Sequence, residues 1–451
     1  MSISLEFQSG FSSFRPQVRS SLVKAGELLF SHAGHSFSRI LGNSFRQTIS
    51  RILSDSRMST EVMLSSHIQA SVKGVKAPEL LLLRIPATYS FGKHRQMEGL
   101  TELQKGVKAL LQHNTFCMTD SGQALGLLDQ YHWVRKGKNA FSVESQKWFR
   151  GLEAVNRHLG HLEKEVVLVQ DREADIFDFF KAKRAPNVEL LVRVFQGRKF
   201  RRQVNPETEK VAKMRQMAPD LPLLGQHRVS IQRGNKRQTL TLEIQAAPVD
   251  VLPRKALSAR LHKTQGLSLV VATEIASIDA NGKDCFQADK AAQWLLLTSL
   301  EAQALEQAIT VVKLYAKRWG VERFHYTMKS GALKVNTLQF DDIETTFNAF
   351  ALYSIVAWRI MYLNFAVKTQ PEQTPQRYFS EQELKILQTK DTQANQSMHH
   401  AIRALGKLVN WVPTTKQPYP KIKITAEALW KLKELTLFLT ILKQNPKPLQ
   451  D

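Results

Sequence analysis

Four polar side chains between Tyr315 and Lys329 have the types and the spacing of a site that binds an anion. The segment reads YAKRWGVERFHYTMK, in which Tyr315, Arg318, Glu322 and Lys329 stand at offsets of 0, 3, 7 and 14 residues. In one continuous helix, which turns about 100° per residue, these offsets fall within about 60° of each other. A carboxylate beside phosphate-binding groups on one helix face suits metal-assisted chemistry on a nucleic acid. The alternative is a solvated helix face with ordinary charge pairs.

A second candidate carboxylate, Asp171, directly follows the clearest buried strand that the sequence predicts, residues 165–170 (EVVLVQ). A side chain at the carboxyl end of a central strand projects into the crevice where such sheets bind ligands. Two-metal cleavage of a phosphodiester needs carboxylates from separate elements that converge, and Arg172, Glu173 and Asp175 are candidate supporting partners. The alternative is a helix start that is rich in acidic residues.

The charge balance points to a polyanionic partner. The chain of 451 residues carries 63 Lys and Arg against 40 Asp and Glu, a formal net charge of +23. An excess of this size, spread along the chain, favours an extended surface for nucleic acid or for an anionic membrane. Cys117 and Cys285 match neither a zinc spacing nor a disulfide framework, which predicts a reducing compartment. No apolar run approaches the ~18 residues of a membrane span, so we expect a soluble cytoplasmic protein.

Changes in the hydrophobic pattern divide the chain into five segments. Short apolar runs between helical stripes predict an α/β core, interrupted by a β-rich insertion with a hairpin signal at residues 233–236 (RGNK). The C-terminal region has a capping box at Ser380 and a heptad-like stripe from Ala428 to Leu442. The expected segments are a helical N-terminal DNA-binding region (1–78), the core in two parts (79–195 and 291–367), the insertion (196–290) and a helical C-terminal region (368–451).

These motifs, taken together, resemble those of a known family. DREADI at 171–176, WLLLT at 294–298, ESQKW at 144–148 and Y-x2-R-x3-E-x6-K at 315–329 are similar to the DDE transposases of bacterial insertion sequences, in the branch that carries the YREK signature. The resemblance covers most of the chain. It implies a ribonuclease-H-like catalytic core with a β-rich insertion, flanked by N- and C-terminal helical regions.

The resemblance also implies roles for single residues. Asp171 and Glu322 would be two of the three catalytic carboxylates that bind Mg2+ or Mn2+. The implied DNA contacts are phosphate binding by Tyr315, Arg318 and Lys329, a further contact by Arg193, and stacking of Trp294 on a flipped base. Stacking on an aromatic face offsets the loss of base stacking in the duplex, although a Trp in such a strand also suits a buried core.

The sequence departs from the family at the first catalytic Asp. The corresponding place reads Arg84-Ile85-Pro86-Ala87-Thr88-Tyr89. One alignment puts Pro86 at the position of the Asp, and another puts Ile85 there; neither side chain binds a metal. Asp120 comes in a later turn and is a poor substitute.

We therefore expect a transposase of a bacterial insertion sequence that binds terminal inverted repeats in double-stranded DNA and is catalytically weak or inactive. The family reaction is cut-and-paste DNA cleavage and strand transfer. A homodimer on two DNA ends, a nucleoid-associated location and no membrane partner are further expectations. The alternatives are a non-catalytic DNA-binding remnant that inhibits transposition, and a ribonuclease-H-like nuclease that acts on cellular nucleic acid.

Overall fold

Apolar strands and amphipathic helices form a mixed α/β fold with two units. The computed structural model describes residues 7, 11–75, 79–91, 97–104, 107–119, 121–134, 140–195, 197–202, 212–213, 218–233, 236–252 and 266–444. Unit 1 comprises Met1–Lys76, Pro86–Ala140 and Gly320–Asp451, and unit 2 comprises Ala77–Ile85 and Phe141–Trp319. Each unit is therefore assembled from segments that are distant in the sequence.

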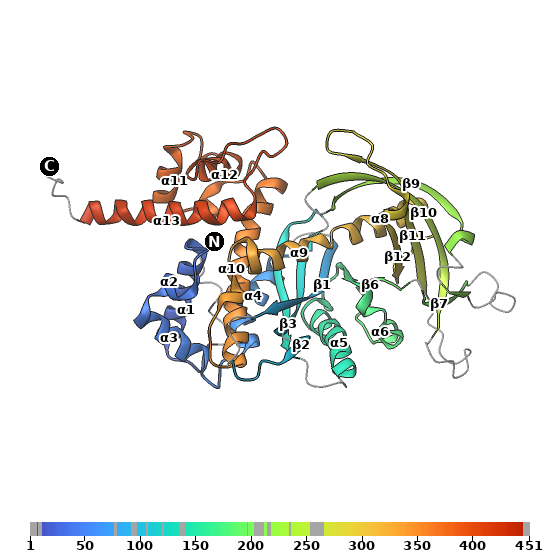
Figure 1. The fold of residues 1–451 in the computed structure, drawn as a ribbon, viewed down its shortest axis with the longest axis horizontal. Coiled ribbons are helices and arrows are strands. Elements are labelled where there is room, and N and C mark those ends of the chain that lie inside the picture. Colours follow the sequence, from blue (N-terminus) through green and yellow to red (C-terminus); the bar gives the residue numbers. More distant parts are fainter. Residues whose placement is uncertain are drawn as a thin grey trace. The chain divides into compact units, whose positions relative to one another are not determined.

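Unit 2 is built on one mixed sheet (Figure 1). Its strands follow the order β1-β5-β6-β12-β11-β10-β7-β8, with β9 beside β10. The first three run parallel, as expected for buried apolar strands joined by a helical crossover, and the other pairs are antiparallel. The bounds are β1 Glu79–Ser90 (residues 79–85 in this unit), β5 Glu165–Gln170, β6 Val188–Arg193, β7 Lys199–Arg202, β8 Ala212–Lys213, β9 Leu223–Arg233, β10 Lys236–Val251, β11 Leu267–Asp279 and β12 Gln293–Thr298.

Three α-helices of unit 2 accompany this sheet. The helix α5 (Ala140–Leu159) precedes β5, and α6 (Phe177–Lys181) connects β5 to β6. The helix α8 (Leu305–Ala316) packs on β9, β10 and β11. Gly225 of β9 permits this packing, because a Cβ atom there would stand 2.9 Å from a methyl group of Leu305. The hairpin predicted at residues 233–236 is confirmed, since Arg233 pairs with Lys236 across β9 and β10.

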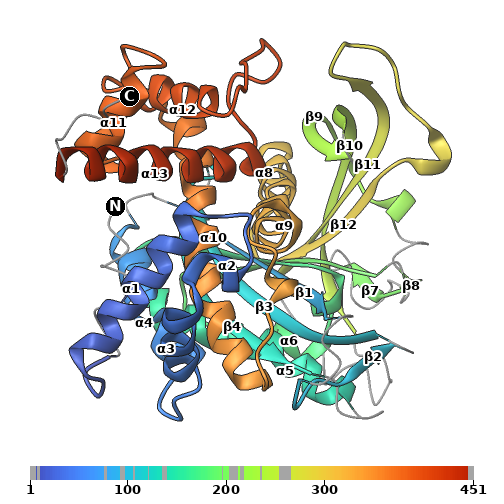
Figure 2. The ribbon, with the colours of Figure 1, turned by 60° about the vertical axis from the view of Figure 1, so that its left-hand side comes forward.

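Unit 1 contains the N-terminal helices, three further strands and the C-terminal helices. The long helix α10 contacts α1, α3, α4, α12 and α13, and Figure 2 shows it running among them. The bounds are α1 Pro16–Ser31, α2 Phe37–Leu41, α3 Asn43–Leu53, α4 Thr60–Lys73, β2 Glu102–Gln104, β3 Val107–Thr119, β4 Ala124–Trp133, α9 Trp319–Tyr326, α10 Ile343–Thr369, α11 Glu381–Gln388, α12 Met398–Lys407 and α13 Ile422–Gln444. The sequence prediction of N-terminal helices is confirmed.

Among the described residues, α10 is the one helix that is long and apolar enough to cross a membrane. Of its most apolar stretch, 94% is buried inside the protein. A helix that is apolar on all sides and covered by other helices is the pattern of a core helix in a soluble protein.

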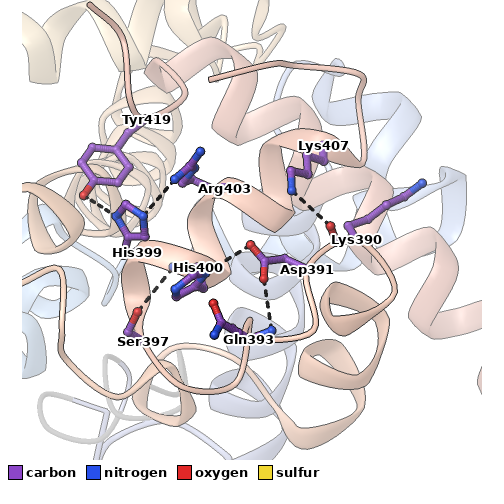
Figure 3. A network of polar contacts seen from close by, with 9 residues as sticks. All are labelled: Lys390, Asp391, Gln393, Ser397, His399, His400, Arg403, Lys407 and Tyr419. Carbon is purple, nitrogen blue, oxygen red and sulfur yellow. Dashed lines mark hydrogen bonds and ion pairs between the residues drawn. The ribbon is translucent and has the colours of Figure 1, made fainter. Parts of the chain in front are cut away.

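The C-terminal helices meet in a polar network (Figure 3). The Arg403 guanidinium donates to Nε2 of His399 at 3.0 Å, and Nδ1 of His399 lies 3.0 Å from the Tyr419 hydroxyl. His400 pairs with Asp391 at 3.2 Å. Because a guanidinium can only donate, Nε2 of His399 carries no proton and the imidazole is neutral. Burial and the nearby charges of Arg403 and His400 lower the pKa of His399 accordingly.

Two C-terminal sequence predictions have different outcomes. The capping box at Ser380 is confirmed, since its hydroxyl and the Glu383 carboxylate each bond the other's backbone N–H. The heptad-like stripe of α13 is buried only in its first half, at Ala428 and Leu432. Its second half is exposed and ends on Leu442 at 38% exposure.

Candidate functional site

Asp171 occupies the carboxyl end of β5, where the sequence predicted it. The strand ends at Gln170, and after Asp171 the residues Arg172–Ala174 form a single 3-10 turn. The Asp171 carboxylate caps this turn by accepting the backbone N–H of Arg172 at 2.7 Å. The side chain remains 31% exposed. The turn therefore holds one accessible carboxylate at the carboxyl end of β5, an inner strand of the unit 2 sheet.

The acidic neighbours of Asp171 have structural partners of their own. Asp175 forms a buried ion pair with Arg198, whose Nε donates to Asp175 Oδ1 at 2.7 Å, and it also accepts the N–H of Phe195 at 3.1 Å. Glu173 pairs with the buried Lys147 of α5 at 2.7 Å. Glu173 and Asp175 therefore hold the Asp171 turn against α5 and the segment after β6, while the third candidate partner, Arg172, donates its backbone N–H to Asp171.

A cluster of cationic and aromatic side chains lies beside Asp171 in unit 2. The Arg318 guanidinium is 3.8 Å from the Asp171 carboxylate and 5.8 Å from the centre of the Tyr315 ring. The Tyr315 ring meets Trp294 edge-on, with 5.5 Å between ring centres. Arg193, the last residue of β6, is level with Leu296 of β12 and lies in the electrostatic environment of Tyr315. The edge thus combines one carboxylate, two guanidinium groups, a phenol and an indole.

The Tyr315 hydroxyl is a buried polar group of this cluster. Tyr315 is 3% exposed, and its hydroxyl makes no well-aligned hydrogen bond among the described residues, although the Arg193 side chain is close enough to act as a donor. Burial raises its pKa, while the positive charges of Arg318 and Arg193 oppose the rise, so the phenol is neutral at physiological pH. A buried polar group without a partner is costly in a folded protein and calls for a ligand or a functional reason.

Trp294 is packed into this cluster. Its side chain is 8% exposed and lies edge-on to Tyr315, in a strand whose other residues are mostly buried. The structure therefore agrees with the core position that the sequence left open for this residue. Stacking on a flipped base would require the indole to become exposed.

The segment from Tyr315 to Lys329 is not the single helix that the spacing predicted. The helix α8 ends at Ala316, a turn at Lys317 and Arg318 follows, and α9 runs from Trp319 to Tyr326. A π-helical segment, Thr327–Gly331, completes the sequence. At the turn, backbone bonds span three residues instead of four, and Gly320, the poorest helix former of the segment, lies two residues after Arg318. The common face was calculated for one straight helix, and the break removes that premise.

Glu322 and Lys329 belong to unit 1 and lie on the two parts of the segment after the break. Glu322 is partly exposed in α9. Lys329 is half-buried in the π-helical segment, where burial lowers its pKa and its ammonium lies 4.8 Å from the centre of the Tyr89 ring. Among the described residues, no carboxylate is within ion-pair distance of Lys329. Within the described part of the chain, this lysine is therefore a cation without a carboxylate partner.

The register of β1 identifies the position that faces Asp171 in the sheet. Arg84 of β1 pairs with Gln170, the last residue of β5, so the same parallel register continued by one residue brings Ile85 level with Asp171. By this register, position 85 is a closer match than position 86 to a carboxylate that would share a metal with Asp171. Asp120, the other residue considered for this motif, lies outside the described residues.

Asp171 is the one carboxylate of the cluster in the described part of unit 2. Ions such as Mg2+ and Mn2+ prefer several oxygen ligands. Within the part of the chain that the structure describes, no three His, Cys, Asp or Glu side chains are grouped as metal ligands.

Three supporting residues were not singled out as site residues from the sequence. Lys147 and Arg198 are charged residues, a type usually found on the surface, yet each is 5% exposed. Lys147 entered the sequence analysis only within the motif ESQKW, and Tyr89 only within the first-strand motif. No family model matches this chain.

Proposed function

We propose that this protein is a DNA-binding member of the transposase class that engages the ends of a bacterial insertion sequence, with a ribonuclease-H-like core and impaired cleavage chemistry. The observation that carries this proposal is the cluster in unit 2. Asp171, Arg193, Trp294, Tyr315 and Arg318 come from four elements and were singled out from the sequence, and they meet at one edge of the sheet. Guanidinium groups beside an unsatisfied hydroxyl suit the phosphate backbone of DNA.

The N-terminal region of unit 1 supports DNA binding independently. A cavity of about 350 Å³ is lined by Phe37, Phe340, Gln339 and one face of α3. That face carries Arg46, Gln47, Ser50 and Arg51. Guanidinium, amide and hydroxyl groups over an aromatic wall are suited to phosphates and base edges. Together with the net charge of +23, this cavity favours a nucleic acid over a small acidic ligand.

The missing carboxylate favours the non-catalytic alternative for the present chain. Two-metal cleavage requires acidic ligands that converge from separate elements, and the β1 position beside Asp171 is Ile85. A protein that binds DNA ends without cutting them would inhibit an active relative. The family's Mg2+- or Mn2+-dependent reaction is therefore proposed for a restored variant, not for this sequence.

The exposed end of α13 supports a homodimer on DNA. Its side chains form an apolar surface that a globular monomer rarely leaves open. The exposed residues are Leu437, Phe438, Leu439, Ile441 and Leu442. A DNA substrate also places the protein in the cytoplasm, at the nucleoid.

DNA binding is tested by fluorescence anisotropy over a range of salt concentrations. The probes are a duplex from the ends of the DNA element that carries the gene and a random-sequence duplex. Arg193→Gln and Arg318→Gln should each reduce the slope of log K against log salt by about 0.9, one phosphate contact. Glu381→Gln, on an exposed helix outside the cluster, is the matched control. Equal slopes for all four proteins would refute the proposed interface.

Cleavage is tested by restoring the carboxylate. Ile85→Asp should gain Mg2+-dependent nicking of the end duplex, whereas Pro86→Asp should not, because position 85 is level with Asp171. Adding Glu322→Gln to Ile85→Asp should abolish the gain. Wild-type cleavage equal to that of Ile85→Asp would show that the missing carboxylate is not disabling.

A further inference from the structure

Lys329 is held by an aromatic ring where an acidic partner would be usual. Its ammonium lies 4.8 Å from the centre of the Tyr89 ring, within the range of a cation–π contact. A carboxylate would neutralise this charge and would compete with an anionic ligand. A ring attracts the ammonium and leaves its charge available, so the arrangement suits a lysine that receives an anion from outside.

Tyr89 is itself fixed from several sides. It is 1% exposed, and its ring packs edge-on against Phe350 of α10 with 4.8 Å between ring centres. Its hydroxyl donates to Oε1 of Gln112 at 2.8 Å and lies 3.3 Å from Nδ1 of His325. Because the single hydroxyl proton goes to Gln112, Nδ1 of His325 is the donor in the second contact. The ring is thereby tied to β3 and α9.

The partners of Tyr89 belong to a larger buried network within unit 1. Oε1 of Gln112 also accepts from Asn114 at 3.1 Å, and its Nε2 lies 3.0 Å from Nε2 of His132. The Asn114 amide oxygen accepts from Gln130 at 2.9 Å. A buried network of this kind is rigid, because a rotation of any member leaves polar groups unpaired. Gln112 therefore allows the Tyr89 ring one orientation.

We propose that Tyr89 is the positioning residue for Lys329: its anchored ring holds the ammonium at the place where a DNA phosphate becomes the missing counter-ion. This inference rests on the proposed function, since it names the group that presents one of the expected phosphate contacts. It also explains why the lysine lies in a π-helical segment, which redirects the chain after α9 so that Lys329 reaches a ring on β1. His325 is three residues after Glu322 in α9, so the same tyrosine anchors the helix that carries Glu322.

The first test is the salt dependence of binding to a random-sequence duplex. Lys329→Gln should reduce the slope of log K against log salt by about 0.9. Tyr89→Met, which removes the ring at similar volume, should give the same loss, and the double variant should lose no more than either single variant. Tyr353→Met is the matched control, because Tyr353 is also 1% exposed and packs on a different ring, Phe37. Its slope should equal that of the wild type, and its effect on affinity should add to that of Lys329→Gln.

The second test needs no DNA. The acylation rate of Lys329 by an N-hydroxysuccinimide ester is measured by mass spectrometry, with the exposed Lys334 as internal reference. Tyr89→Met should accelerate acylation about two- to fivefold, the factor that an exposed cation–π contact contributes. Tyr89→Phe, which keeps the ring but loses both hydrogen bonds, should give a smaller increase and remains informative if Tyr89→Met does not fold.

The outcomes separate the two proposals. Wild-type acylation rates in both Tyr89 variants would overturn the positioning role, whatever the DNA result. If Lys329→Gln leaves the salt slope unchanged while the Tyr89 variants alter the acylation rate of Lys329, the DNA contact of Lys329 and the assigned ligand are refuted. If Tyr353→Met lowers the salt slope as much as Tyr89→Met does, Tyr89 acts only through general packing.

Discussion

The buried ion pair between Asp175 and Arg198 offers the sharpest test of how the Asp171 turn is held. The two side chains are 0% and 2% exposed. Arg198 also donates to the backbone oxygens of Asp175 at 2.5 Å and of Leu252 at 3.4 Å. The perturbation is Asp175→Asn, which keeps the shape of the side chain but leaves a buried guanidinium without its counter-charge.

The expected loss follows from this burial. Removing one partner of a fully buried, hydrogen-bonded ion pair costs about 3–5 kcal/mol, because the remaining charge stays desolvated. For a unit of this size, the loss corresponds to a decrease of roughly 6–20 °C in the melting temperature. Arg198→Met should lose a similar amount, because it leaves the buried Asp175 carboxylate without its counter-charge and two backbone oxygens without a donor. In the double variant the losses should not add, with a coupling energy of about 2–3 kcal/mol.

The assay is native-state hydrogen exchange of the β5 and β6 amides, which reports the stability of unit 2 by itself. Glu381→Gln on α11 removes one partner of an exposed ion pair, with side chains 84% and 67% exposed, and should leave exchange unchanged. A loss below about 1 kcal/mol in Asp175→Asn, or strictly additive losses in the double variant, would refute the reasoning.

Three further outcomes are expected. His399→Gln should flatten the pH dependence of stability in unit 1, measured as the urea midpoint between about pH 7.5 and about pH 5. Burial lowers the pKa of His399 in the folded state, so the unfolded chain binds more protons as the pH falls through the unfolded value of about 6.5. The wild type therefore has its full stability above that pH and loses stability below it. Equal pH slopes in the two proteins would contradict this. Gly126→Ala should lower the free energy of unfolding, measured by thermal unfolding, by about 1–3 kcal/mol or more. Gly126 has a φ of +152°, and a Cβ atom there would stand 1.9 Å from the Ser71 hydroxyl oxygen. Gly197→Ala, which has open space around it, should be tolerated. Tyr315→Phe should change stability by no more than about 1 kcal/mol, since the buried hydroxyl makes no well-aligned hydrogen bond and has only Arg193 as a nearby donor. The same variant should weaken DNA binding, and a destabilised variant with full affinity would exclude a ligand role for this hydroxyl.

The candidate site shows where prediction from sequence succeeded and where it failed. Asp171 was found because a run of apolar residues that ends in an acid has one interpretation in a parallel sheet. The geometric argument from the YREK spacing assumed one straight helix, and this premise is wrong because the segment is broken at Lys317 and Arg318. Local sequence gives the period of a helix but not the turn at Lys317 and Arg318 or the π-helical segment, which depend on what the flanking helices pack against.

The sequence by itself determined the basic charge, the strands and helices with strong periodicity, and the absence of an Asp in the first-strand motif. These features depend on residue type and short-range spacing. Only the tertiary structure decided that Ile85 is level with Asp171, that Asp175 binds Arg198 and that Lys329 lies on Tyr89. Such contacts join residues separated by up to hundreds of positions, and they are set by strand register and core packing, which the local pattern does not contain.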